Sequence, residues 1–567
     1  MERTGAQIVW ECLVREGVEV VFGYPGGATL PLYDAMNDYP IHHVLVRHEQ
    51  AAAHAADGYA RVSGKVGVAI ATSGPGATNL VTGIATAMMD SSPIVCITGQ
   101  VATSALGSDA FQETDITGIT LPITKHNYLV TQVEDLAQTL REAFHIARTG
   151  RPGPVLVDLP KDVQTARTEF VYPEGPVRLP GYQPEPDDPL DVDVERALDL
   201  INAAERPVVL AGHGVFLAGA MRELLAFAER GNIPVALTLL GLGGFPASHR
   251  LCLGMMGMHG HAAANLAIQH ADLLVALGMR FDDRVTGNLK AYARGAQKVH
   301  VDLDPTELNK NVPVDVAIAG DLRRVLQAWL PHVEARDRGA WLAQVEAWRE
   351  ESHERDILGH APEGRLYPAQ VIHGLWQATR GRAIVVTDVG QHQMWVAQYY
   401  RHDRGPALIT SGGLGTMGFG LPAGIGAKIA APDEEVWVVC GDGGFQMNVQ
   451  ELGTLVQEGL DLRVALMNNG FLGMVRQWQE LFYGRRYTAT RLQNPDFCRL
   501  AEAYGLRALR VKRPEDVLPA VEAARAAEGP ILIDFWVEQE DNVYPMVPAG
   551  ADLDKMIRRP RPVRELA

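Results

Sequence analysis

Cysteine is scarce in this sequence, and no two cysteines form a C-x-x-C pair. The five are spread over the whole chain: Cys12, Cys96, Cys252, Cys440 and Cys498. Their spacing indicates neither a zinc site nor a disulfide framework, and it fits a reducing compartment. Positively charged residues are also few. The sequence has 51 Lys and Arg against 68 Asp and Glu, which gives a formal net charge of −17. Nucleic acid needs a basic protein face, so we expect no nucleic-acid partner.

Long apolar runs are missing too, and we predict no membrane-spanning segment. A helical pattern starts at once, with Ile8, Val9, Cys12 and Leu13 on one face, and leaves no room for a signal or transit peptide. We therefore expect a cytoplasmic protein. The apolar share of 47% and the charged share of 21% are ordinary for a soluble globular enzyme.

Strand and helix patterns alternate along most of the 567 residues, which is typical of α/β domains with doubly wound parallel sheets. We predict three such domains, the middle one Rossmann-like. The predicted boundaries are residues 1–170 for the N-terminal domain, 171–190 for a proline-rich linker, 191–335 for the middle domain, 336–366 for a helical linker, 367–540 for the third domain, and 541–567 for a loop-like tail.

The chain is organised around the stretch from Val436 to Trp478. An apolar strand, Val436–Cys440, leads into a Gly-Asp-Gly-Gly loop at 441–444. A helix should follow, with Val449, Leu452, Leu455 and Val456 sharing one face. A second apolar strand, 463–467, then ends on the Asn-Asn pair at 468–469.

Asp442 and Asn469 close the two predicted strands of this stretch. In a right-handed strand–helix–strand unit the carboxyl ends open on one sheet edge, so we expect the two side chains to lie side by side. A carboxylate and an amide oxygen suit Mg²⁺, which takes its other ligands from phosphate and water. The Gly-Asp-Gly tripeptide alone would be interpreted as a turn, but the pair at this spacing favours a metal and phosphate site.

This stretch resembles the thiamine-diphosphate motif, which begins Gly-Asp-Gly and ends Asn-Asn. The resemblance covers nearly the whole chain and implies a pyrimidine-binding domain first, a middle domain, and a diphosphate-binding domain last. It implies Mg²⁺ held by Asp442, Asn469 and the backbone carbonyl of Phe471. The thiamine-diphosphate contacts that it implies are Gly390, Gln391, His392, Gly415, Met417, Gly443, Gly444 and Met474.

Glu49 is the predicted catalytic carboxyl group. It follows a strand and precedes a helix rich in small residues, and a carboxyl group hydrogen-bonded to the pyrimidine ring would favour the tautomer that activates the cofactor. The alternative is a first-turn glutamate favoured by the helix dipole. The resemblance also implies that Met417 is the wedge that bends the cofactor, whereas His392 alone would be a surface or capping histidine.

Four further blocks are similar to the catalytic subunit of biosynthetic acetohydroxyacid synthase, also called acetolactate synthase. They are residues 73–79, 110–115, 280–287 and 473–478, of which the last two are the most diagnostic. The resemblance implies an enzyme that decarboxylates pyruvate and condenses the two-carbon unit with pyruvate or 2-oxobutyrate, the first common step of branched-chain amino-acid biosynthesis. The alternatives are a catabolic acetolactate synthase, a related decarboxylase or oxidase, and, formally, a regulatory protein without turnover.

In this family an arginine corresponding to Arg280 holds the incoming keto acid, and Trp478 shapes the acceptor pocket. Without the resemblance, Arg280 would be a surface arginine paired with Asp282 or Asp283, and Trp478 would be a packing residue. The resemblance further implies that Phe111, Gln112 and Lys161 line the same pocket from across a dimer interface. We expect a homodimer with active sites at its interface, or a tetramer, and a small regulatory subunit.

FAD is implied for the middle domain by resemblance more than by motif, because no complete G-x-G-x-x-G occurs there. The family's flavin has no net redox role. Ala102 stands where many family members carry proline, which leaves herbicide sensitivity open. The implied FAD contacts are Arg151, Gly212, Gly214, Thr238, Leu239, Gly278, Arg280, Arg284, Asp302 and Asp321.

Overall fold

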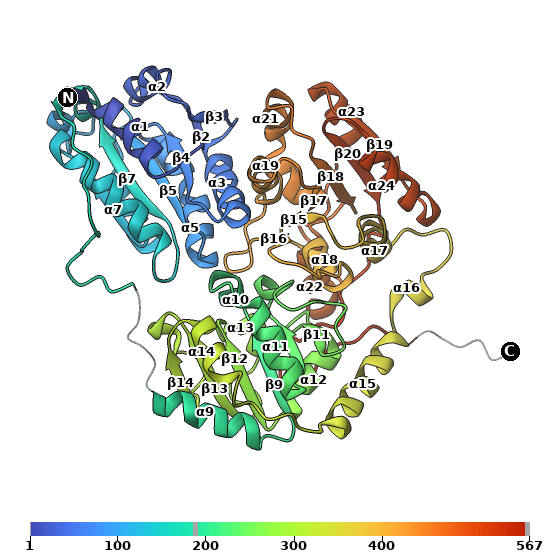
Figure 1. Cartoon of the computed structure of the whole chain (residues 1–567). Coiled ribbons are helices and arrows are strands. Elements are labelled where there is room, and N and C mark those ends of the chain that lie inside the picture. Colours follow the sequence, from blue (N-terminus) through green and yellow to red (C-terminus); the bar gives the residue numbers. More distant parts are fainter. Residues whose placement is uncertain (1, 185–190, 562–567) are drawn as a thin grey trace.

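Three six-stranded sheets, parallel throughout, form three α/β domains in the computed structural model, which describes residues 2–184 and 191–561 (Figure 1). The N-terminal domain, in blue, and the C-terminal domain, in orange and red, lie beside each other above the green middle domain. The predicted α/β class is confirmed. Strands buried on both faces need continuous apolar runs, and the central strands of each sheet supply them.

The N-terminal sheet has the strand order β3-β2-β4-β5-β7-β6. Its strands are β2 (Val20–Tyr24), β3 (His42–Leu45), β4 (Gly67–Ala71), β5 (Ile94–Gln100), β6 (His126–Leu129) and β7 (Val155–Pro160). The helices are α1 (Gly5–Arg15), α2 (Leu30–Met36), α3 (Glu49–Ser63), α4 (Pro75–Asn79), α5 (Val81–Asp90), α6 (Ile116–Thr120), α7 (Leu136–Arg148) and α8 (Lys161–Thr165). A separate antiparallel pair joins β1 (Glu2–Thr4) to β8 (Arg167–Glu169).

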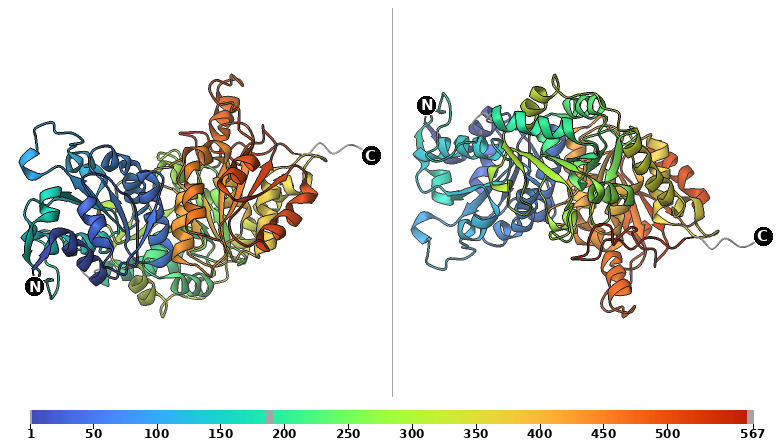
Figure 2. Two further views of the ribbon diagram at one scale, coloured as in Figure 1. Left: turned by 90° about the horizontal axis from the view of Figure 1, so that it is seen from above. Right: turned by 90° about the horizontal axis from the view of Figure 1, so that it is seen from below.

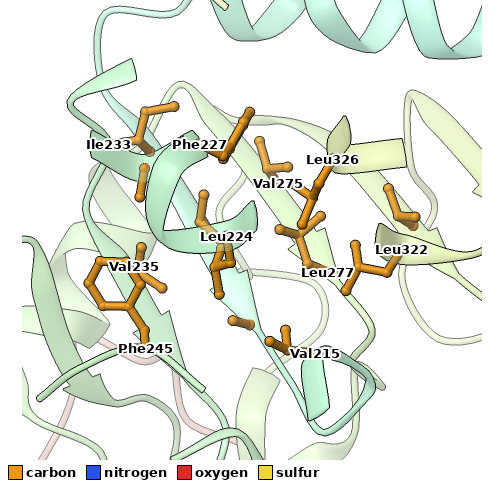
Figure 3. Packing of buried hydrophobic residues seen from close by; sticks show 14 of the residues in the cluster. Val215, Leu224, Phe227, Ile233, Val235, Phe245, Val275, Leu277, Leu322 and Leu326 are labelled. Atoms are coloured by element: carbon orange, nitrogen blue, oxygen red, sulfur yellow. The ribbon is translucent and has the colours of Figure 1, made fainter. Parts of the chain in front are cut away.

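The middle sheet has the order β11-β10-β9-β12-β13-β14, which is the doubly wound Rossmann order. Its strands are β9 (Pro207–Ala211), β10 (Val235–Leu237), β11 (Cys252–Met255), β12 (Leu273–Leu277), β13 (Gln297–Asp302) and β14 (Val316–Ala319). Its helices are α9 (Asp191–Ala203), α10 (Gly214–Leu217), α11 (Met221–Gly231), α12 (Ala262–His270), α13 (Asp283–Thr286) and α14 (Leu322–Trp329). Phe227, Val275 and Leu326 belong to the buried cluster that joins helices to sheet (Figure 3).

The C-terminal sheet, β16-β15-β17-β18-β20-β19, repeats the topology of the N-terminal sheet. Its strands are β15 (Ile384–Thr387), β16 (Leu408–Ile409), β17 (Val436–Gly441), β18 (Arg463–Asn468), β19 (Arg507–Val511) and β20 (Ile531–Trp536). The helices are α17 (Pro368–Thr379), α18 (Gln391–Tyr399), α19 (Gly420–Ala430), α20 (Asp442–Met447), α21 (Leu452–Gln457), α22 (Gly473–Phe482), α23 (Phe497–Tyr504) and α24 (Val517–Arg525). The helices α15 (Gly339–His353) and α16 (Ile357–His360) precede this domain.

The single helix predicted after Asp442 is wrong. The segment divides into α20, a 3₁₀ turn at Val449–Glu451, and α21, and Val456 is 38% exposed instead of sharing the buried face. The break falls at Asn448, whose side-chain amide donates a hydrogen bond of 2.7 Å to the carbonyl of Gly418. This contact with another loop is a tertiary interaction that helical periodicity cannot reveal.

The N-terminal and C-terminal domains dock through helices α3 and α19, which lie side by side in both Figure 1 and Figure 2. A methyl group at Gly58 would overlap the Ala423 carbonyl, and one at Gly426 would overlap the Ala55 carbonyl. Small residues on both helices therefore allow the two backbones to approach closely. At the end of this contact the Arg61 guanidinium binds Asp57 and Asp90 and donates to the Thr410 carbonyl.

The two predicted irregular segments are described only in part. Residues 185–190 of the proposed linker and 562–567 of the proposed tail lie outside the described residues. The tail nonetheless packs against the rest of the chain, because Val547, Leu553 and Met556 belong to a buried cluster of the middle domain. Among the helices of residues 2–184 and 191–561, none combines the length and the apolar character that crossing a membrane requires.

Candidate functional site

A small cavity lies at the carboxyl ends of β15, β17 and β18, where the sheet order reverses between β15 and β17. Such a switch point is where open α/β sheets bind ligands. The structure brings together here most of the residues predicted for metal and diphosphate. The cavity is lined by Gly390, Gln391, His392, Met417, Asp442, Gly443, Gly444, Asn469 and Phe471, among others.

Asp442 is buried and held by three hydrogen-bond donors. Its Oδ1 accepts from the Gly443 N–H at 3.0 Å, and its Oδ2 accepts from the Gly470 N–H and the Asn494 side-chain amide, both at 2.7 Å. Burial raises the pKa of Asp442 to about 6, so the carboxyl group is still mostly ionised at pH 7. The carboxylate is therefore fixed in place and negatively charged.

Asn494 was not predicted from the sequence. Its side-chain amide donates to the Asp442 carboxylate at 2.7 Å and to the Asn468 side-chain oxygen at 3.0 Å, so it ties the ends of β17 and β18 together. It lies in an irregular segment before α23 with no motif around it, and no local pattern could have singled it out.

The donor set of the cavity fits Mg²⁺. Asp442 offers one carboxylate, Asn469 an amide oxygen and Phe471 a backbone carbonyl on the same cavity wall. Residues 2–184 and 191–561 contain no group of three or more His, Cys, Asp and Glu side chains placed to hold a metal ion. One carboxylate with neutral oxygens is typical of a Mg²⁺ site completed by phosphate and water.

Two polar atoms in the cavity have no partner, and of the two only His392 Nε2 can donate to a phosphate oxygen, because Gln391 Oε1 is an acceptor. Gln391 Oε1 and His392 Nε2 are buried without a hydrogen-bond partner, although the Gln391 amide donates to Gln477 and to the Asp541 carbonyl. Burial lowers the pKa of His392 to about 4, and a hydrogen bond from the ring to the Asp388 backbone acts against that fall. Because this bond uses the one N–H of the neutral ring, Nε2 donates to a phosphate oxygen only when the ring takes up a second proton, which a bound anion favours. Buried polar atoms normally have partners, and a diphosphate would supply one for His392.

Met417 reaches over the Gly-Asp-Gly-Gly loop, since its Cε lies 3.4 Å from where a Cβ at Gly443 would be. Gly415 lies two residues before it on the same glycine-rich loop. Met474 and Trp478 are one turn apart on α22. Met474 is partly buried against the core, and the Trp478 ring meets the Phe482 ring edge-on with 5.4 Å between ring centroids. Neither of the two lines the cavity.

Glu49 lies in the N-terminal domain, at the start of α3. It is 9% exposed, and its Oε2 accepts a hydrogen bond of 2.8 Å from Asn79. The backbone of Gln112 packs on Gly74, where a Cβ would lie 2.8 Å from the Gln112 carbonyl oxygen. Gly76, in α4 directly after this position, lies beside Glu49, so the start of α4 links Glu49 with Gln112.

The remaining N-terminal candidates face solvent. Phe111 is 88% exposed, and Lys161 is exposed at the start of α8. None of the N-terminal candidates, Glu49 included, lines the Asp442 cavity of the same chain. Within one chain the two halves of the predicted active site are therefore separate.

The middle domain places a third group of candidates at its own switch point, between β9 and β12. Gly212 and Gly214 follow β9 and pack on Gly278 after β12; a Cβ at Gly214 would lie 2.6 Å from the Gly278 Cα. Thr238 and Leu239 follow β10, and Asp302 ends β13. Burial raises the pKa of Asp302 to about 6. The backbone of these glycines and the Asp302 carboxylate together fit a dinucleotide such as FAD.

Four other FAD candidates already have protein partners. Arg151 pairs with Asp304 at 3.3 Å and Glu307 at 2.9 Å. Arg280 lies 4.0 Å from Asp282, which is the surface pairing weighed as an alternative, and Arg284 pairs with Asp283 at 3.2 Å. Asp321 caps α14 by accepting from the Arg324 N–H at 2.8 Å. A ligand at these positions would compete with or add to these contacts.

Family models match all three domains of the chain. They are described as the N-terminal binding domain, the central domain and the C-terminal binding domain of thiamine pyrophosphate enzymes, over residues 3–119, 194–329 and 388–535. Thiamine pyrophosphate is another name for thiamine diphosphate.

Several proteins named as acetolactate synthases are similar over nearly the full chain. The acetolactate synthase large subunit of Corynebacterium glutamicum is 50% identical, over 97% of this chain and 89% of its own length. The large subunit of acetolactate synthase isozyme 3 of Escherichia coli is 47% identical, over 98% of both chains. A probable acetolactate synthase large subunit of Methanocaldococcus jannaschii is 46% identical, over 98% of this chain and 95% of its own.

Proposed function

The chain belongs to the family of acetolactate synthase large subunits, and from this membership we propose that it condenses pyruvate with a second 2-keto acid. The products would be 2-acetolactate from pyruvate and 2-aceto-2-hydroxybutyrate from 2-oxobutyrate, precursors of the branched-chain amino acids. The observation that carries the proposal is the cavity whose lining combines Asp442 and Asn469 with Gly443, Gly444 and His392, whose Nε2 has no partner. Thiamine diphosphate and Mg²⁺ fit these groups.

Each residue of the cavity has a distinct task in this proposal. Asp442, Asn469 and the Phe471 carbonyl would hold Mg²⁺, and the Gly443 and Gly444 backbone with His392 would bind the diphosphate. Met417 would impose the bent conformation, and Glu49 would hold a proton at a pyrimidine nitrogen. When bound, thiamine diphosphate supplies the carbon nucleophile and the electron sink for loss of CO₂. Arg280 would orient the keto-acid carboxylate.

The test of this function is a product assay with each cofactor omitted in turn. Pyruvate, alone and mixed with 2-oxobutyrate, is incubated with protein stripped of cofactors and then supplied with thiamine diphosphate, Mg²⁺ and FAD. Acetohydroxy acids should form only when thiamine diphosphate and Mg²⁺ are both present. Acetaldehyde or acetate as the main product would instead indicate a decarboxylase or an oxidase.

FAD is proposed as the third cofactor, bound at the switch point of the middle sheet. The Rossmann strand order and the cradle formed by Gly212, Gly214 and Gly278 support it. Protein purified without added flavin and then denatured should release FAD. A preparation that is active and neither contains nor responds to FAD would rule this assignment out.

A complete active site is proposed to need two copies of the chain. Glu49 and Gln112 do not line the Asp442 cavity of their own chain, and apolar side chains near both half-sites are left exposed. Those side chains are Phe111, Leu414, Met447, Val475 and Tyr483. A second copy would cover them and place its Glu49 over the first copy's Met417.

Mixing two inactive variants tests this arrangement. If one chain supplies Glu49 and the other supplies Asp442, a dimer of one Glu49→Gln and one Asp442→Ala chain has one intact site. Random re-association of equal amounts should restore about one quarter of wild-type activity. Activity is measured as acetolactate formed after dissociation and reassembly. No recovery, with dimers re-formed, would place both residues in one chain's site.

Trp478 is proposed to set the preference for 2-oxobutyrate. Trp478→Leu removes a rigid wall of the acceptor pocket, and one methylene distinguishes the two acceptors, so the preference should fall by about tenfold. Acetolactate synthesis should persist, because the pyruvate step uses other groups. The measurement is competition between both keto acids. Trp536→Leu, a partly exposed tryptophan of the same domain, is the control and should keep the wild-type product ratio.

We also propose a small regulatory subunit as partner. The support is the large-subunit naming of the similar proteins from Corynebacterium glutamicum and Escherichia coli, which implies a separate small chain. Affinity purification of the tagged chain from its native source should recover a smaller protein that alters its activity. A chain that purifies alone and shows full, effector-independent activity would argue against such a partner.

A further inference from the structure

Asp388 is a buried carboxylate that none of the assignments above uses. It follows β15 directly and is only 1% exposed. Within residues 2–184 and 191–561 no cationic side chain acts on its charge. Three backbone N–H groups stabilise its charge instead: those of Val389 at 2.8 Å, Gly418 at 3.0 Å and Gly420 at 2.9 Å. A buried charge held by so many donors is an organised feature of the fold.

The Asp388 carboxylate also touches the first turn of α20, here called the diphosphate loop, which contains Gly443 and Gly444. A methyl group at Gly444 would overlap its Oδ1, so the loop backbone lies directly on the carboxylate. Three segments therefore meet at this one side chain. They are residues 389–392, residues 417–420 and residues 443–444, and each of them supplies predicted cofactor contacts.

We propose that Asp388 is a positioning residue of the cofactor site, whose carboxylate sets Met417 at its working distance from the Gly443–Gly444 backbone. The proposal rests on the proposed function, since it assigns Asp388 a role toward the same cofactor. Met417 immediately precedes Gly418, whose N–H binds both carboxylate oxygens, at 3.1 and 3.0 Å. A shift of the Asp388 carboxylate would therefore move Met417 relative to the Gly443–Gly444 backbone.

The ionised form is needed for this role. Burial raises the pKa of Asp388 to about 6, and the three N–H donors act against that rise. The negative charge also lies at the N-terminal end of α19, where the helix dipole favours an anion. Asparagine in its place would keep one acceptor oxygen but would turn an NH₂ donor toward a backbone N–H, so at least one of the three contacts would be lost.

Asp90 provides a matched comparison at the other end of the glycine-rich loop, residues 412–420, that Asp388 holds. Its carboxylate accepts from the Gly412 N–H at 3.0 Å and the Gly413 N–H at 2.6 Å, so it too anchors two loop glycines. It differs from Asp388 in being paired with Arg61 at 3.0 Å and in having no contact with the diphosphate loop. A general loosening of the loop should follow from loss of either aspartate.

The experiment compares D388N and D90N in the full chain stripped of cofactor. Binding of thiamine diphosphate at saturating Mg²⁺ is followed by calorimetry, and the melting temperature of the cofactor-free protein is recorded alongside. D388N should weaken cofactor binding by about 10- to 100-fold, as loss of an outer-shell partner does at metal sites. D90N should lower the melting temperature at least as much but leave cofactor binding within about threefold of wild type.

Any of four outcomes would count against the proposal. Unchanged binding in D388N, or equal losses in D388N and D90N, would reduce Asp388 to a structural anchor. Wild-type protein that binds no thiamine diphosphate would overturn the proposed function itself. If D388N gives no folded protein, D388E keeps the charge and moves the carboxylate by one methylene. Wild-type affinity in folded D388E would likewise count against the positioning role.

Discussion

Glu49→Gln should lower acetolactate formation by about 100-fold or more, the range typical of a lost acid–base group, while thiamine diphosphate stays bound. The amide is nearly isosteric, so the hydrogen bond from Asn79 and the packing beside Gly76 are retained. An amide is neither a useful acid nor a useful base, so it cannot hold the proton at the pyrimidine nitrogen.

The measurement for Glu49 is hydrogen–deuterium exchange at C2 of the bound cofactor, followed after rapid acid quench. Exchange should slow in parallel with turnover, because both depend on the same activation. Glu223→Gln is the control, since Glu223 is 9% exposed like Glu49, lies on α11 of the middle domain and accepts from the Arg323 guanidinium at 2.7 Å. Wild-type exchange in Glu49→Gln would remove Glu49 from its proposed role.

Asp442→Ala should abolish magnesium-dependent retention of thiamine diphosphate. The substitution deletes the only carboxylate of the predicted metal site, and without it the diphosphate has no ionic bridge to the protein. It also leaves the Gly470 N–H and the Asn494 amide without their acceptor, which adds the cost of unpaired buried donors. Calorimetry with Mg²⁺ and cofactor should detect no saturable binding.

Asn494→Ala provides a graded control for Asp442. The metal-binding carboxylate remains, but one of its fixing donors is lost, so the affinity for Mg²⁺ and cofactor should fall by about 10- to 100-fold instead of vanishing. Both variants need a melting curve without cofactor to show that they fold. If Asp442→Ala keeps metal and cofactor as tightly as wild type, the metal site is misplaced.

Fold class and most of the central strands could be predicted because parallel strands buried on both faces need continuous apolar segments. Val436–Gly441 and Arg463–Asn468 illustrate this, since both appear as apolar runs ended by polar residues. Strands at the sheet edges, among them β6, β11, β14, β16 and β19, are harder to predict. Edge strands are short and have one neighbour, so their sequences carry little periodic signal.

Candidates that end an apolar strand could be named from the sequence because strand ends share one edge of a parallel sheet. Asp442, Asn469 and Gly390 meet in one cavity for this reason. Asp388 and Asn494 could not be named, because their importance lies in the backbone N–H groups and carboxylate that other segments bring to them. Hydrogen bonds between distant segments leave no trace in local periodicity.

Residue order alone was therefore sufficient for the three α/β domains, for the Gly-Asp-Gly to Asn-Asn unit, and for the family resemblance that the comparisons confirm. These features depend on neighbours along the chain, and strand periodicity and motif spacing record them. The break of the helix at Asn448, the Asp388 anchor and the separation of Glu49 from the Asp442 cavity were decided only by tertiary packing. Each of them depends on contacts between segments that the sequence keeps far apart.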